Sequence, residues 1–141
     1  MRYIALSCMV LGGLASPVAS AADNISTAKQ FADQYEVFAQ KLDTKFKASV
    51  ADGREFYTKK HSVKGKDISC SSCHTDNPTQ KGKHAESGKE IQPLSPNTNP
   101  KRFAVLNKSE EGFVKHCNDI LARNCTPQEK ANYVTYLLSA K

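Results

Sequence analysis

The sequence predicts an all-α fold organised around one short motif, Cys70-Ser71-Ser72-Cys73-His74. Apolar residues recur at helical spacing on both sides of the motif, and no run after the N-terminal segment has the pattern of a strand. Two cysteines two residues apart, followed at once by histidine, are the attachment signature of c-type haem. Cys70 and Cys73 would bind the two vinyl groups of one haem c, and His74 would be the proximal iron ligand.

Two other interpretations of the motif stay open. A dithiol redox pair of the thioredoxin type would require a βαβ pattern around the motif, and none is visible. A zinc site could be completed by Cys117 and Cys125. Export of the chain, which the N-terminus indicates, favours haem.

The N-terminal segment has the features of a secretory signal peptide. Met1 and Arg2 precede an apolar run that ends at Val18, and Ala19-Ser20-Ala21 has the A-x-A cleavage pattern. The run is too short to span a membrane, although an uncleaved anchor is the alternative. Residues 1–21 are therefore expected to be removed on export to the periplasm. Residues 22–141 would then form one monohaem cytochrome c domain without a membrane span.

The remaining cysteines can be assigned in pairs. Cys8 lies within the signal peptide, and thiols outside the cytoplasm are usually oxidised. If haem takes the motif cysteines, Cys117 and Cys125 form a disulfide. A continuous helix would hold their Cα atoms about 12 Å apart, whereas a disulfide needs about 4.4–6.8 Å. The helix must therefore end between them, and Asn124 is the expected point of reversal.

The chain is basic, with a formal net charge of +6. Many of its lysines flank the motif: Lys59, Lys60, Lys64, Lys66, Lys81, Lys83 and Lys89. A solvated loop surface is one explanation. The other is a docking face for an acidic periplasmic or membrane-bound electron-transfer protein. An exported chain is not expected to bind nucleic acid.

Two helices are expected before the motif. The first follows an apolar stripe, with Thr27 and Gln30 as its capping box. The second begins at Asp52 as N-cap and turns Phe56 and Tyr57 toward the core. The residues of the stripe are Ala28, Phe31, Tyr35, Phe38, Leu42 and Phe46.

The segment after the motif is expected to be irregular. The motif opens a brief helix, and residues 76–100 then contain repeated proline and glycine. Ile91, Pro93 and Leu94 form an apolar island within this polar tract. We expect these three residues to cover a face or edge of the haem.

Two more helices are expected near the C-terminus. Ser109 is the expected N-cap of the first, because acids follow it in the first turn. Thr126-Pro127-Gln128-Glu129 combines an N-cap, a first-turn proline and a glutamate three residues on, which predicts the start of the last helix. Its apolar face would consist of Tyr133, Val134, Leu137 and Leu138.

The sixth iron ligand cannot be methionine in the mature chain, because Met1 and Met9 both lie in the signal peptide. The candidates are a histidine, a weak ligand such as asparagine or lysine, or no ligand. A distal ligand must reach the opposite haem face, which favours a segment far from the motif. His116 is therefore preferred to His61 and His84.

Several long segments closely resemble the cytochrome c″ family: residues 87–96, 101–103, 115–121 and 125–132. The resemblance extends over most of the mature chain. It implies a periplasmic monohaem protein with a class I cytochrome c-like core, an additional N-terminal helix and one disulfide. It also implies two histidine ligands in the oxidised state and release of the distal histidine on reduction. That histidine corresponds to His116, and the disulfide to Cys117 and Cys125.

The SHP-type cytochromes resemble the chain in the same loop and disulfide, but they have asparagine where this chain has His116. That group binds oxygen and other small diatomic ligands when reduced, so the histidine favours the cytochrome c″ family. The expected function is one-electron transfer by a monomeric carrier rather than an enzyme, coupled to ligand release and proton uptake. The alternatives are a protein that binds or reduces oxygen, nitric oxide or hydroxylamine, and a carrier whose two ligands stay bound.

Overall fold

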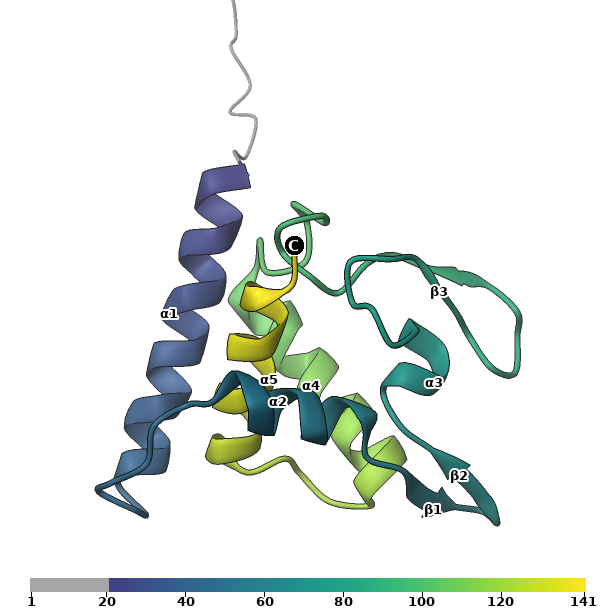
Figure 1. Cartoon of the computed structure of the whole chain (residues 1–141), viewed down its shortest axis with the longest axis horizontal. Coiled ribbons are helices and arrows are strands. Elements are labelled where there is room, and N and C mark those ends of the chain that lie inside the picture. The colour runs from purple at the N-terminus through teal and green to yellow at the C-terminus, as the bar shows by residue number, and fades with distance from the viewer. Residues whose placement is uncertain (1–20) are drawn as a thin grey trace, which may run out of the picture.

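The computed structural model describes residues 21–141, with side chains from Asn24 onward. The predicted signal peptide therefore lies, except for Ala21, outside the described residues. The described part is mainly helical (Figure 1), as predicted. Its elements are α1 (Ala21–Gln40), α2 (Val50–Thr58), β1 (His61–Val63), β2 (Lys66–Ile68), α3 (Ser71–His74), β3 (Gly82–Lys83), β4 (Glu90–Ile91), α4 (Leu106–Leu121) and α5 (Pro127–Ser139).

The four strands correct the expectation that the mature chain has none. They form two antiparallel pairs, β1 with β2 and β3 with β4. Each strand is only two or three residues long. Strands this short cannot establish the alternating pattern by which a strand is recognised in a sequence.

Helix α1 is displaced toward the N-terminus relative to the prediction. Thr27 lies inside the helix, so the predicted capping box is wrong. The helix ends at Gln40, and the Gln40 side-chain amide donates to the carbonyl of Phe46 over 3.1 Å. This turn takes Leu42 and Phe46 out of the apolar stripe, and Leu42 is 72% exposed.

The N-cap of helix α2 is Ser49, three residues before Asp52, so the predicted N-cap is wrong. The hydroxyl of Ser49 caps the helix and accepts a hydrogen bond from the backbone N–H of Asp52 at 3.2 Å. Tyr57 is fully buried, as expected. The helix crosses α5 at Gly53, where a Cβ atom would lie 2.0 Å from the carbonyl oxygen of Asn132. Glycine at this position therefore allows the close approach of the two helices.

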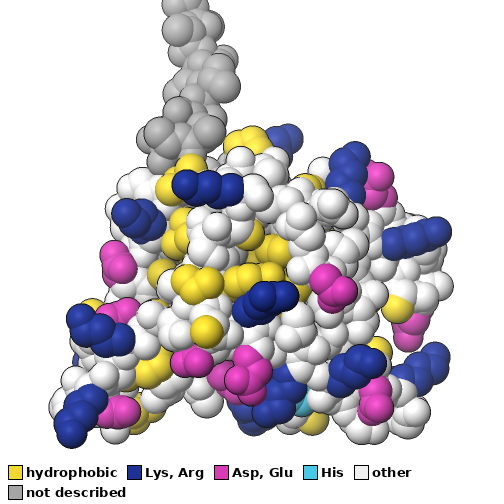
Figure 2. Space-filling model, viewed as in Figure 1, with side chains coloured by type: hydrophobic (Ala, Val, Ile, Leu, Met, Phe, Trp, Pro, Cys, Tyr) yellow, Lys and Arg dark blue, Asp and Glu magenta, His cyan; other side chains and the backbone are white. Residues whose placement is uncertain are grey.

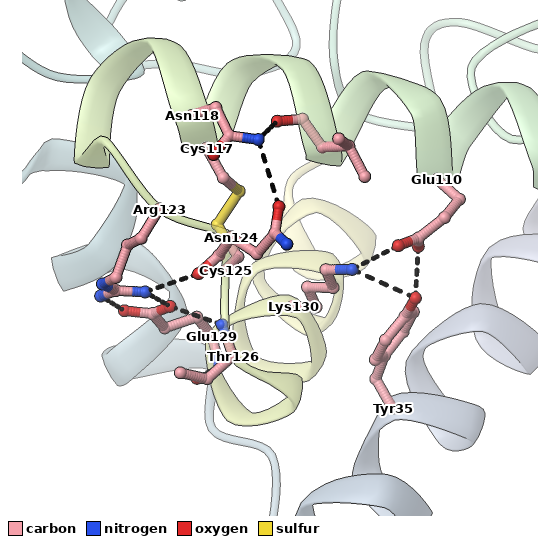
Figure 3. Close-up of a disulfide and its surroundings, with 11 residues drawn as sticks. Tyr35, Glu110, Cys117, Asn118, Arg123, Asn124, Cys125, Thr126, Glu129 and Lys130 are labelled. Carbon is pink, nitrogen blue, oxygen red and sulfur yellow. Dashed lines mark hydrogen bonds and ion pairs between the residues drawn. A yellow bond between two sulfur atoms is a disulfide. The ribbon is translucent and has the colours of Figure 1, made fainter.

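Helix α4 also differs from the prediction at both ends. Ser109 is not the N-cap: it is buried inside the helix, and its hydroxyl donates to the carbonyl of Val105 at 3.2 Å. The chain reverses at Ala122, which adopts the left-handed conformation with φ 54°, rather than at Asn124. Reversal within this turn brings the Cα atoms of Cys117 and Cys125 to 5.5 Å, and the predicted disulfide is present (Figure 3).

The predicted start of α5 is confirmed. The hydroxyl of Thr126 accepts from the backbone N–H of Glu129 at 3.2 Å, and the Glu129 carboxylate accepts from the backbone N–H of Thr126 at 2.8 Å. Arg123 forms an ion pair with the same carboxylate at 2.7 Å (Figure 3). Because the two capping residues lie only three positions apart in the sequence, the capping box depends little on the rest of the fold.

The core is formed where α5 packs against α1 and α2, with α4 joined to it by aromatic contacts. The rings of Phe31 and Phe113 stack with centroids 5.6 Å apart, and Phe113 meets the edge of Tyr133 at 5.5 Å. These three rings connect α1, α4 and α5 in a single buried cluster.

A polar triad adds a second connection between the same three helices (Figure 3). Lys130 is 7% exposed, and its ammonium contacts the Glu110 carboxylate and the Tyr35 hydroxyl. The Tyr35 hydroxyl also donates to Glu110. Burial, followed by the Glu110 hydrogen bond, raises the pKa of Tyr35, so the phenol stays protonated. The triad fixes the first half of α4 to the core.

Replacing both disulfide cysteines, Cys117→Ala with Cys125→Ala, should lower the free energy of unfolding by about 2–3 kcal/mol in the chain-entropy model. It should also weaken any ligation by His116, which is adjacent to Cys117. Chemical denaturation measures the first effect. Val114→Ala, at a residue of α4 that is 45% exposed, serves as a control and should change stability by about 0.5 kcal/mol or less. Free thiols at positions 117 and 125 in protein from an oxidising compartment would contradict the prediction.

Candidate functional site

The Cys70–His74 motif forms the predicted short helix, α3, which begins after Cys70. Strand β3 packs directly against it, since a Cβ atom at Gly82 would lie 2.1 Å from the carbonyl oxygen of Cys73. The hydroxyl of Tyr57 donates to the carbonyls of His74 and Thr75, at 3.1 and 2.5 Å. The motif is therefore held in place by α2 on one side and by a hairpin on the other.

The two motif thiols are free, whereas Cys117 and Cys125 are bonded to each other. Burial raises the pKa of Cys70 to about 11, so its thiol is protonated at neutral pH. Redox-active dithiols instead have a lowered pKa, which disfavours the thioredoxin-type alternative. The disulfide also removes two of the four thiolates that the zinc alternative requires.

A mostly apolar cavity lies beside the motif, with α4 as its longest wall. The lining residues of α4 are Gly112, Phe113, His116, Cys117, Ile120 and Leu121, and the others are Phe56, Lys59, His61, Cys70, Arg102, Cys125 and Tyr133. An apolar cavity with a few convergent polar groups is typical of a cofactor site.

The predicted site residues are only partly gathered around this cavity. Cys70, His116 and the two disulfide cysteines line it, whereas Cys73 and His74 lie on the adjoining helix. Ile91, Pro93 and Leu94 do not line it. Leu94 is 7% exposed and belongs to the protein core, and Ile91 lies in β4. That these three residues cover a haem stays a prediction.

The motif histidine is held neutral. Burial lowers the pKa of His74 to about 4, with smaller contributions from His116 and Arg102. The Nδ1 atom of His74 is buried, and no group in the described part of the chain forms a hydrogen bond with it. A neutral imidazole has the lone pair that binds a metal ion.

His116 is also neutral at pH 7, although its ring is exposed at the rim of the cavity. Its pKa is lowered from 6.5, first by desolvation and then by Lys115, while Asp119 acts in the opposite direction. Arg102 and His84 lower it further. His116 thus lies within electrostatic reach of both His74 and Arg102.

The cavity residues fit a covalently bound haem in three respects. The donor set of two thiols and two neutral imidazoles is the one that such a haem requires. The Nε2 atom of His61 and the Nε atom of Arg102 are buried and have no hydrogen-bond partner among the described residues. Gly112 leaves the adjoining face of α4 bare, because a Cβ atom there would meet nothing within 4 Å. A glycine inside a helix lowers the stability of the helix by about 1 kcal/mol relative to alanine. A glycine at this point of α4, with the open face that it creates, is therefore an unusual feature.

Sequence analysis missed several residues of the cavity, among them Gly112, Arg102 and Tyr133. Tyr133 was expected only in the core. Arg102 was part of a segment that resembles a known family, but no spacing distinguished it from the other basic residues. Only the folded chain places it beside the cavity.

Comparisons of the sequence and of the structure with known proteins find the same relatives. Residues 43–137 match a family model described as "Domain of unknown function (DUF1924)". Cytochrome c″ of Methylophilus methylotrophus is 42% identical over 123 residues, which cover 86% of this chain and 85% of that protein. Its oxidised crystal structure superposes with a TM-score of 0.79 at 41% identity, covering 83% of this chain and 97% of that one. A solution structure of the same protein, presented as an insight into haem-ligand detachment, has a TM-score of 0.75 at 42% identity and covers 82% and 94% of the two chains.

A more distant relative is the cytochrome c-type protein SHP of Cereibacter sphaeroides. It is 39% identical over 69 residues, which are 49% of this chain and 53% of that protein. The structure of oxidised SHP, described as an oxygen-binding cytochrome c, superposes with a TM-score of 0.60 at 29% identity and covers 84% of this chain and 96% of that one. The fold is therefore common to both relatives.

Proposed function

The chain belongs to the cytochrome c″ family of c-type cytochromes, and from this membership we propose that it is a periplasmic one-electron carrier with a single haem c. Cys70 and Cys73 bind the haem covalently, and residues 22–141 form the monohaem domain after the signal peptide is removed. Neither motif cysteine forms a disulfide with another described residue, and burial keeps the Cys70 thiol protonated by raising its pKa. Both points support this assignment, because each thioether forms by adding a thiol to a vinyl group.

In the proposed oxidised state, His74 and His116 would be the two protein ligands of the haem iron. The observation that carries this proposal is that the two neutral imidazoles lie within electrostatic reach of each other, one on the motif helix and one on the wall of the cavity. His61 also lines the cavity, so it is the residue against which the assignment of His116 has to be tested.

On reduction, His116 would release the iron, and its imidazole would then be free to take up a proton below its pKa, which is lowered from 6.5. The relative whose solution structure concerns haem-ligand detachment supports this step. So does the position of His116 at the exposed rim of the cavity, where the ring can reach water. The disulfide beside it limits the movement of the backbone, so the movement is assigned mainly to the side chain.

The proposed partners are other periplasmic or membrane-bound electron-transfer proteins, and the protein acts as a monomer. The seven lysines that flank the motif are all exposed, and only Lys81 among them forms an ion pair in the described part of the chain, with Glu90 at 2.8 Å. On the face shown in Figure 2, basic side chains lie over the region of the two hairpins with acidic ones among them. None of the described helices is long and apolar enough to cross a membrane.

The alternative function is binding or reduction of small ligands, which the oxygen-binding relative favours. Carbon monoxide and oxygen added to the ferrous protein distinguish the possibilities. We expect carbon monoxide to change the visible spectrum, because His116 has left its site, and oxygen to oxidise the protein without a stable complex. A stable oxygen complex would support the alternative. A ferrous spectrum that carbon monoxide leaves unchanged would mean that both ligands stay bound.

A further inference from the structure

We propose that the guanidinium of Arg102 binds a carboxylate of the bound haem and that this ion pair raises the haem's reduction potential. The inference rests on the proposed haem binding in the cavity. It concerns a residue of this chain that the motif and its expected ligands do not include.

Arg102 has no counter-charge within the described part of the protein. Its Nε atom is buried without a hydrogen-bond partner, and no ion pair among the described residues includes it. The guanidinium lies over the ring of Phe103, with Cζ 4.8 Å from the ring centroid, and it also interacts with the hydroxyl of Tyr133. Both neighbours are neutral. The side chain is half-buried, so water solvates the cation only in part, and an anion is expected to pair with it.

The position of Arg102 relates this cation to the haem. Arg102 lines the same cavity as Cys70 and His116. A haem bonded to Cys70 and ligated by His116 would therefore lie in the cavity that the guanidinium borders. The anionic groups at the edge of a haem are its two propionates, and the planar guanidinium matches a carboxylate with two parallel hydrogen bonds.

The backbone that carries Arg102 is fixed before any ligand binds. Its N–H donates to the carbonyl of Asn99 at 3.1 Å. Asn24 of α1, 2% exposed, donates to the carbonyl of Pro96 at 2.9 Å and accepts from the N–H of Phe103 at 2.9 Å. Arg102 therefore projects from a loop that is held to α1, and binding has little backbone freedom to remove.

The effect on the haem follows from the sign of the charge. A nearby cation favours the ferrous state, which carries one positive charge fewer than the ferric state. Arg102→Gln should therefore lower the equilibrium constant for reduction about tenfold, which corresponds to about 59 mV for one electron. Arg102→Lys keeps the charge and loses the planar fork, so its shift should be smaller. Arg54→Gln is the control, because Arg54 is an exposed residue of α2 and the substitution removes the same positive charge. Solvent screens the charge of Arg54, so this variant should change the equilibrium constant for reduction about twofold or less.

The test is a redox titration of the four holo-proteins at one pH and ionic strength, combined with the propionate bending band in their resonance Raman spectra. We expect that band to move in both Arg102 variants and to stay in place in Arg54→Gln. Equal potential shifts in Arg102→Gln and Arg54→Gln, or an unmoved band, would overturn the inference. If Arg102→Gln does not fold, the band of Arg102→Lys decides. Haem content is measured first, because wild-type protein without haem would refute the proposed function itself and not only the inference about Arg102.

Discussion

Replacing both motif cysteines, Cys70→Ala with Cys73→Ala, should abolish covalent haem and leave a poorly folded chain. Without the thiols no thioether can form, and a haem held by axial ligands alone is lost on denaturation. Cys70 packs against the buried core next to Tyr133 and the wall formed by α4. The cavity that the haem would fill would remain as an apolar void or collapse, and voids in a core are strongly destabilising.

Mass spectrometry of the denatured protein and circular dichroism measure the two effects. Cys117→Ala with Cys125→Ala is the matched control, since it also removes two cysteines, both of which line the cavity, and should keep its covalent haem. Wild-type protein that carries no haem but holds stoichiometric zinc would contradict the prediction and restore the zinc alternative.

The second large effect concerns proton coupling through His116. While its ring nitrogen is bound to iron, the lone pair is not free to take a proton, whereas a released imidazole can take one. The reduced protein then binds more protons than the oxidised protein, so low pH favours reduction. The reduction potential should therefore fall as the pH rises toward the pKa of the released His116 and level off above it. The slope cannot exceed about 59 mV per pH unit for one proton and one electron.

The surroundings of His116 indicate where this fall occurs. Its pKa is lowered from 6.5, chiefly because the ring is desolvated and next because Lys115 is close. The fall should therefore lie on the acid side of pH 6.5. Potentiometric titration at a series of pH values measures it.

Variants separate the histidines. His116→Ala should lose the low-spin ferric signature and flatten this part of the pH dependence, while His84→Ala, at a histidine outside the cavity wall, should keep both. Haem propionates add a smaller slope of their own, so the comparison between variants carries more weight than the wild-type curve. Loss of the low-spin signature in His61→Ala, with His116→Ala unaffected, would show that the ligand had been assigned to the wrong histidine.

The parts of the fold that sequence could predict are those set by neighbouring residues. The capping box of Thr126 and Glu129 is formed as expected because both partners lie within one helical turn. The disulfide followed from counting thiols in an oxidising compartment, and the required reversal of the chain is present. The spacing of Cys70, Cys73 and His74 predicts haem attachment because the chemistry of attachment fixes that spacing, and their role stays a prediction.

The parts that could not be predicted depend on tertiary contacts. Ser109 has the sequence environment of an N-cap, but it is buried within α4 and its hydroxyl bonds to the preceding turn of the helix. Leu42 continues a helical stripe, yet the chain turns back before it and leaves it exposed. The role inferred for Arg102 depends on Asn24, which is distant in sequence and anchors its loop to α1. No local pattern encodes a contact of that kind.

The most direct test of the central proposal is the spin state of the haem in both oxidation states at neutral pH. EPR of the oxidised protein and visible spectra of both states give the answer in the wild-type protein. Two histidine ligands in the oxidised state predict a low-spin ferric haem, and release of His116 predicts a high-spin ferrous haem. A protein that stays low spin in both oxidation states would contradict the account.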